Sequence, residues 1–146
     1  MNPTIRPAMP QDWEAVQGLL VQSELPLDGA RDHLQDFLLA FDEDGLVACA
    51  GLEYYEGAAL LRSVAVRPGH RGRGIGKALV TALLARTAER KIGNVALLTT
   101  TAVDYFPRMG FTAVARDSLP EGVKASEEFK SACPDTATAM VLVPGQ

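Results

Sequence analysis

The sequence has few cysteines, no long apolar run and no excess of positive charge. Its two cysteines, Cys49 and Cys133, are too few for a disulfide framework, so we expect a reduced, cytoplasmic protein. No apolar run reaches the length that spans a membrane, and the first residues lack the apolar core of a signal peptide, so we expect no membrane partner. A net charge of −4 argues against nucleic acid as the main partner.

Metal ligands and repeats are scarce as well. His33 and His70 have no partner at a metal-binding spacing, and the acidic run at 42–44 is typical of a solvated turn, so we expect no metal. No repeat or low-complexity tract divides the chain. With 47% apolar and 22% charged residues in 146, the composition predicts one globular domain over residues 1–146.

One continuous stretch, residues 60–90, carries the most specific signal. The apolar, partly β-branched run at 60–66 predicts a buried strand, which the sequence Arg-Pro-Gly-His at 67–70 then ends. Residues 71–76 read Arg-Gly-Arg-Gly-Ile-Gly, and the apolar stripe that follows at 77–90 predicts a helix. The unit is therefore a strand, a glycine-rich turn and a helix.

A turn of this kind favours an anion. Glycines let the backbone approach a ligand closely, and the free N–H groups at the start of a helix point toward it. Arg71 and Arg73 add positive charge with a geometry that suits phosphate, so we expect a diphosphate group to bind. The alternative is a glycine-rich loop without a binding role, in which both arginines are solvated.

The spacing excludes two common nucleotide loops. A Walker-type loop needs glycine at position 71 and Ser or Thr at position 78, where the chain has Arg71 and Ala78. A dinucleotide fingerprint needs a third glycine, but its two possible registers place Lys77 or Leu79 there.

The remaining pattern, R-x-x-G-x-G after a V-A-V strand, resembles the GNAT superfamily of N-acetyltransferases. The resemblance implies that the loop binds the pyrophosphate of acetyl-CoA and that the strand pairs its backbone with the pantetheine arm. It also places Phe106 beside the cofactor. The cofactor residues that it implies are Val64, Ala65, Val66, Arg71, Gly72, Arg73, Gly74, Ile75, Gly76, Lys77 and Phe106.

The rest of the chain fits the same family. We expect strands at 4–6, 37–41, 46–54, 58–66, 94–101, 111–115 and 138–143, and helices from residue 10, at 30–36, 77–90 and 102–110. Residues 91–93 are expected to close the long helix in the manner of a C-cap, and residues 116–135 to form a long excursion with a helical turn near 127–129. The predicted class is α/β (α+β): a mixed six- to seven-stranded sheet with about four helices and a splayed parallel strand pair.

Catalysis in this family commonly uses a tyrosine four residues before the glycine of a G-F pair, as an acid for the thiolate. Here that position is Phe106, and its neighbour Tyr105 is the candidate acid. Strand alternation places Glu53 among small and apolar neighbours, which makes it the candidate general base. The alternative is that Glu53 is solvated or pairs with Arg62.

Two polar residues, Arg62 and Ser63, interrupt the apolar cofactor strand and need a partner if they are buried. We expect Arg62 to bind a substrate carboxylate, with hydrogen bonds from Ser63, Thr99 and Thr100. The alternative is that Arg62 points to solvent where the strand bends. In the family the segment before residue 36 covers the acceptor, so Leu25 and Leu27 either line a pocket or pack on the core.

Two further segments resemble a narrower group. Residues 97–102 with the following F-x-x-x-G-F are similar to N-acetylglutamate synthase domains and to arsenic-resistance N-acetyltransferases, and the tail at 128–140 is similar to the latter group. This resemblance implies acetylation of a small, amino-acid-like amine, in arsenic or toxic-analogue resistance. N-acetylglutamate formation, protein-lysine acetylation and a non-catalytic acyl-CoA-binding module stay open, as does a homodimer. Cys133 is expected to be a buried structural residue.

Overall fold

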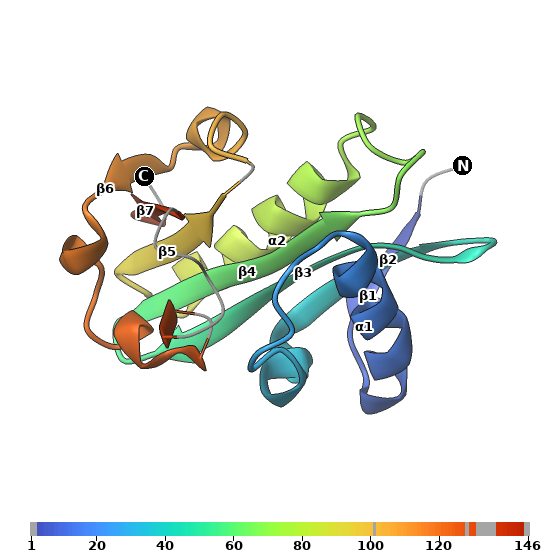
Figure 1. The fold of residues 1–146 in the computed structure, drawn as a ribbon, viewed down its shortest axis with the longest axis horizontal. Coiled ribbons are helices and arrows are strands. Elements are labelled where there is room, and N and C mark those ends of the chain that lie inside the picture. Colours follow the sequence, from blue (N-terminus) through green and yellow to red (C-terminus); the bar gives the residue numbers. More distant parts are fainter. Residues whose placement is uncertain (1–2, 101, 128, 131–136, 145–146) are drawn as a thin grey trace.

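A seven-stranded mixed sheet with the strand order β1-β2-β3-β4-β5-β7-β6 forms the centre of the protein (Figure 1). The computed structural model describes residues 3–100, 102–127, 129–130 and 137–144. The strands are β1 (Thr4–Pro7), β2 (Phe37–Asp42), β3 (Gly45–Tyr55), β4 (Ala58–Val66), β5 (Asn94–Thr99), β6 (Thr112–Val114) and β7 (Thr138–Leu142). β4 and β5 pair in parallel, because a helix connects them, and the other neighbours are antiparallel.

Two α-helices are present among the described residues, α1 (Trp13–Gln22) and α2 (Ile75–Glu89). Five further segments are short 3-10 turns: η1 (Pro10–Asp12), η2 (Arg31–Asp36), η3 (Phe106–Met109), η4 (Arg116–Ser118) and η5 (Val123–Ala125). Residues 127 and 129–130 are helical as well. The expected strands and the mixed sheet are confirmed, whereas the expected helices at 30–36 and 102–110 are reduced to 3-10 turns. These segments are too short, and in η3 too rich in proline, to propagate an α-helix.

α2 ends in the expected segment, residues 91–93. Lys91 adopts the left-handed conformation, with a φ of 58°. The amide of Ile92 donates to the carbonyl of Thr87 at 3.0 Å, as in a Schellman motif. Gly93 instead donates its amide to the carbonyl of Gly57 at 2.9 Å, which ties the start of β5 to the β3–β4 turn.

The two faces of the sheet are covered differently (Figure 1). α2 covers one face, where Leu79, Val80 and Leu83 are fully buried against the central strands. On the opposite face, α1 and η2 cover β2 to β4, and η4 and η5 with their connecting residues cover β4, β5 and β7. Burial of these apolar side chains supplies most of the stability. No described helix has the length and hydropathy of a membrane span.

Residues 101, 128 and 131–136 lie outside the described residues. The helical turn expected near 127–129, most of the arsenic-resistance tail pattern and the role of Cys133 therefore fall wholly or partly outside the part of the chain that the structure describes.

Candidate functional site: a cavity at the gap between β4 and β5

The glycine-rich loop leads directly into the first turn of α2. Gly69, Gly72 and Gly74 adopt positive φ angles of 91°, 81° and 80°, a region that glycine enters without strain. Gly74 is the N-cap of α2, so the following amides have no carbonyl partner within the helix. Arg71 is fixed at the loop by a 3.1 Å hydrogen bond from its Nε to the carbonyl of Val66. The start of α2 is thus an anion-binding geometry.

β4 and β5 separate shortly after they pair. Their register covers only Ala58–Leu60 of β4 and Asn94–Ala96 of β5. Beyond it, β5 continues alongside β7, whereas β4 bends at a bulge in which two of its residues oppose one residue of β3. Ser63 lies in this bulge with a φ of 57°, unusual for a residue other than glycine. The thiol of Cys49 donates to the carbonyl of Ser63 at 3.2 Å and so satisfies a group that the bulge removes from the ladder.

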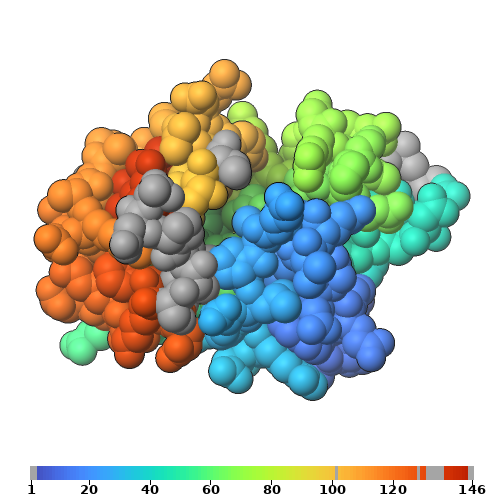
Figure 2. All heavy atoms as spheres, in the orientation of Figure 1, coloured from blue at the N-terminus to red at the C-terminus, as the bar shows by residue number. Residues whose placement is uncertain are grey.

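A cavity of about 1480 Å³ opens where the two strands part. Figure 2 shows its hollow between the blue segment after α1, the lime-green glycine loop and the yellow end of β5. Four groups of residues line it: 22–26 after α1, 61–66 of β4, the loop and first turn of α2, and the segment from β5 to η3. Its wall carries three long cationic side chains besides Arg62, namely Arg71, Lys77 and Arg108.

Most of the predicted site residues meet in this cavity. Among the predicted cofactor residues, all except Arg73 line it, and Arg73 is exposed in the same loop. The predicted substrate residues Arg62, Ser63, Thr99 and Thr100 also line it, as do Tyr105 and Leu25. Glu53 is not among the lining residues, and Leu27 packs against the α1 side of the core. Their roles stay predictions.

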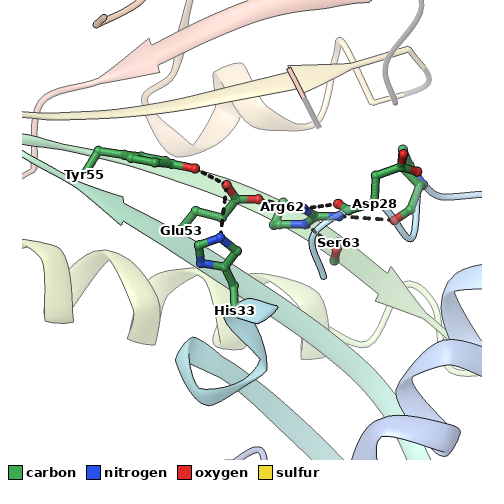
Figure 3. Close-up of polar contacts among 7 residues, drawn as sticks. Asp28, His33, Glu53, Tyr55, Arg62 and Ser63 are labelled. Atoms are coloured by element: carbon green, nitrogen blue, oxygen red, sulfur yellow. Dashed lines mark hydrogen bonds and ion pairs between the residues drawn. The ribbon is translucent and has the colours of Figure 1, made fainter. Parts of the chain in front are cut away.

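Glu53 and Arg62 form a buried ion pair on the sheet face opposite α2 (Figure 3). Arg62 Nη1 lies 2.6 Å from Glu53 Oε2, and their side chains are 0% and 1% exposed. The Tyr55 hydroxyl donates to Glu53 Oε1, and His33 Nε2 lies 3.6 Å from that same oxygen. Arg62 was expected either to bind a substrate carboxylate or to point to solvent. Its side chain does not face solvent, and its guanidinium is not free, because it is paired with Glu53.

The surroundings of Glu53 favour its ionised form. Burial alone raises the pKa of a carboxyl, but hydrogen bonds from Tyr55, Arg62 and Ser126 and the charge of Arg62 outweigh it, so the pKa of Glu53 is lowered. Burial and the bond to Glu53 raise the pKa of Tyr55 to about 12. Glu53 is therefore an ionised hydrogen-bond acceptor whose two oxygens are both engaged.

Tyr105 and Phe106 point to different surroundings. Phe106 is buried and packs edge-on against Phe111, with ring centroids 5.7 Å apart. Tyr105 is 36% exposed, and a Cβ added at Gly76 would meet its hydroxyl at 3.5 Å. The hydroxyl thus lies beside the first turn of α2, and burial raises the pKa of Tyr105.

Four residues of this region escaped the sequence analysis as site residues. Tyr55 contacts Glu53 and lies two residues after it in β3, so strand alternation could have placed both on one face. His33 also contacts Glu53, but its spacing from Glu53 carries no local signal. Arg108 lines the cavity two residues after Phe106, and its positive charge so close to a predicted cofactor residue is a signal that the sequence does contain. His70 lines the cavity, and its Nε2 lies 2.9 Å from Asp42 Oδ2, which ties the loop to β2. Within the described residues, no group of His, Cys, Asp and Glu is arranged to hold a metal.

Comparison with known proteins gives consistent matches. The family model "Acetyltransferase (GNAT) domain" matches residues 33–113. An uncharacterized N-acetyltransferase of Chlorobaculum tepidum is 29% identical over 93 residues, which cover 63% of this chain and 59% of that protein. The amino-acid acetyltransferase of an Enterobacter species is 32% identical over 120 residues, covering 78% of this chain and 26% of that protein. The chain thus spans between about a quarter and three fifths of the length of these curated relatives.

Solved structures share the fold. N-acetylglutamate synthase from Neisseria gonorrhoeae, in complex with coenzyme A and N-acetyl-glutamate, superposes with a TM-score of 0.84 at 19% identity, over all of this chain and 36% of that chain. A Mycobacterium tuberculosis protein in complex with CoA superposes with a TM-score of 0.78 at 26% identity, over 97% of this chain and 99% of that one. The family match covers more than half of the chain and shows that it belongs to the GNAT family of acetyltransferases.

Proposed function

We propose that the protein is an acetyl-CoA-dependent N-acetyltransferase whose acceptor is the amine of a small, amino-acid-like molecule. The observation that carries the proposal is the course of β4. From residue 61 to 66 it has no β5 partner, and this free edge lies in a cavity between a cationic helix start and Arg62. A long ligand with a diphosphate end and a chain that can hydrogen-bond to a strand edge fits this shape.

The residues at the loop end fit the diphosphate of acetyl-CoA. Gly74 and Gly76 have no side chain that could cover the first amides of α2. There is also little room for one at Gly76, where an added Cβ would lie 3.2 Å from Val66. Arg71 and Lys77 add positive charge beside these amides. When bound, acetyl-CoA supplies an activated acyl group. The protein's part is to hold it, with the backbone of Val64–Val66 along the pantetheine arm and the loop on the diphosphate.

The acceptor class rests on the relatives. The Enterobacter relative is named an amino-acid acetyltransferase, and the Neisseria structure was solved with N-acetyl-glutamate. In this chain, Arg62 and Ser63 line the cavity, but the Arg62 guanidinium is already bonded to Glu53 and to the carbonyls of Pro26 and Asp28. A free amino acid, glutamate, or a toxic glutamate analogue that carries phosphorus or arsenic belongs to the class that the relatives suggest.

A second candidate function is a non-catalytic acyl-CoA-binding module. It is favoured by Phe106, which is buried at the place where the family commonly has an acidic hydroxyl. In that case the chain would bind acetyl-CoA but transfer nothing.

Thiol release from acetyl-CoA tests both functions. The amine panel would contain free amino acids, glutamate, phosphinothricin-type and arsenical glutamate analogues, polyamines and a lysine peptide. Lys77→Gln is expected to weaken acetyl-CoA binding, whereas Arg86→Gln, which removes one positive charge from the last turn of α2, serves as the matched control. Turnover of an amino-acid-like amine supports the enzyme. Tight acetyl-CoA binding without turnover supports the binding module, and absence of binding contradicts both.

A further inference from the structure

The ion pair of Glu53 and Arg62 lies between two apolar clusters on the sheet face opposite α2. One cluster contains α1 and η2, and the other contains η4 and η5. The pair is buried, and His33 and Tyr55 bring two further polar groups to it (Figure 3). A buried charged pair adds little stability compared with apolar residues, so its retention calls for a second role.

Arg62 distributes its donors over three elements. Its Nε donates to Ser63 Oγ at 3.0 Å within β4, and its Nη1 donates to Glu53 in β3. Two donors then reach the connection between α1 and η2. Nη1 donates to the carbonyl of Asp28 at 2.7 Å, and Nη2 donates to the carbonyl of Pro26 at 3.3 Å. These two bonds fasten the connection to the sheet.

The fastened connection, residues 23–29, is also a wall of the cavity. Residues 22–26 line it directly, and Leu25 and Leu27 also pack against the apolar cluster that contains α1. Gly29 has a φ of 76°, and a Cβ added there would meet Arg62 Nη1 at 3.3 Å. The chain thus passes close over the guanidinium. Any displacement of Arg62 is therefore transmitted to the wall beside the acceptor end.

We propose that Arg62 and Glu53 are positioning residues that hold segment 23–29 in place and so set the width of the acceptor end of the cavity. Glu53 orients the guanidinium of Arg62, and Arg62 holds segment 23–29 in place through its hydrogen bonds to Pro26 and Asp28. Glu53 is not placed to take a proton from the acceptor, because its oxygens already accept from Arg62 and Tyr55 and it does not line the cavity. As a statement about acceptor selection, this inference rests on the proposed function.

Hydrogen–deuterium exchange on the full chain without ligand tests the fastening itself. Arg62→Lys keeps the charge but replaces a five-donor fork by a single ammonium, which cannot reach Ser63, Pro26 and Asp28 together. Glu53→Gln keeps the shape and removes the charge. We expect faster exchange in both variants at the amides of Ser23, Leu25 and Ala30, which are hydrogen-bonded in the native segment, and unchanged exchange in α2. Arg86→Gln is the control. Unchanged exchange at these amides in Arg62→Lys overturns the proposal.

Kinetics on whichever panel amine is turned over then tests the consequence. We expect Glu53→Gln and Arg62→Lys to raise the KM of the amine about tenfold or more, with the KM of acetyl-CoA within about twofold of the native value. The acid limb of the pH profile of kcat/KM should keep its position in Glu53→Gln. A loss of kcat of about a hundredfold or more together with loss of that limb would instead make Glu53 the general base and refute the positioning role. If the native chain binds no acetyl-CoA, the proposed function fails while the exchange result still decides the fastening.

Discussion

Removing both partners of the Glu53–Arg62 pair should destabilise the protein by less than the sum of the two single removals. Glu53→Leu leaves the guanidinium buried without a counter-ion, and Arg62→Met does the same to the carboxylate, since both side chains are at most 1% exposed. Such a change costs about 3–5 kcal/mol, a large part of the total stability of a typical domain, which is about 5–15 kcal/mol.

The double variant removes both charges at once. What it still lacks are the hydrogen bonds from Arg62 to the carbonyls of Pro26 and Asp28, each worth about 1–3 kcal/mol when the carbonyl stays buried. We therefore expect a loss of about 2–6 kcal/mol, against about 6–10 kcal/mol if the two single changes were additive.

Urea unfolding followed by circular dichroism measures these differences. With a slope of about 2 kcal/mol/M, each single change should lower the urea midpoint by roughly 2 M. Glu56→Gln, an exposed glutamate in the turn after β3, should shift stability by less than about 0.5 kcal/mol. Additive single changes, or a Glu53→Leu variant within about 1 kcal/mol of the native protein, would refute the reasoning.

The remaining predictions concern pH, packing, reactivity and the loop. Because the folded-state pKa of Glu53 is lowered, its stabilising contribution is complete above the unfolded pKa near 4.5 and is lost as pH falls through the folded pKa; the penalty of Glu53→Gln, measured by urea unfolding from pH 7 to pH 3, should therefore shrink toward acid. Gly51→Ala should destabilise the protein by about 1–3 kcal/mol in thermal unfolding, because the new Cβ would lie 2.2 Å from the Phe37 ring; an unchanged Tm would contradict that packing. Burial raises the pKa of Cys49 to about 12, so in a Cys133→Ser background the native protein should not react with a thiol reagent at pH 8 until it is unfolded. Gly76→Ala should weaken acetyl-CoA binding about tenfold in calorimetry, because the new Cβ would lie 3.2 Å from a Val66 methyl group and 3.5 Å from the Tyr105 hydroxyl and would narrow the cavity at the start of α2; unchanged affinity would place the diphosphate elsewhere.

Local patterns were enough to predict the strands and the loop. The hairpin at 42–45 and the glycine-rich turn before α2 carry short-range signals that tertiary contacts do not override. The cap of α2 was predicted within residues 91–93, but not which of the three takes the left-handed position: Lys91 does, while the amide of Gly93 pairs with Gly57. That choice depends on a contact with a distant turn, which a local pattern does not contain.

The ion pair of Glu53 and Arg62 could also be predicted only in part from the sequence. Strand alternation placed Glu53 on the correct sheet face, and pairing with Arg62 was one of the two alternatives to a catalytic role. The register explains the pairing: Glu53 lies opposite Leu60 and Arg62 lies opposite Gly51, so the two are diagonal neighbours with no side chain at Gly51 between them. The contacts with Pro26 and Asp28 join residues 36 and 34 positions apart in the sequence. No spacing rule reaches that far.

The bulge at Ser63 gives the sheet a property that ordinary sheets avoid. A strand with free N–H and C=O groups normally invites another chain to pair with it, and proteins usually hide or charge such edges. Here the free stretch of β4 lies in the middle of the sheet, recessed between the first turn of α2 and segment 23–29. We therefore expect this recessed edge to favour a thin, extended molecule over the exposed strand of a folded partner.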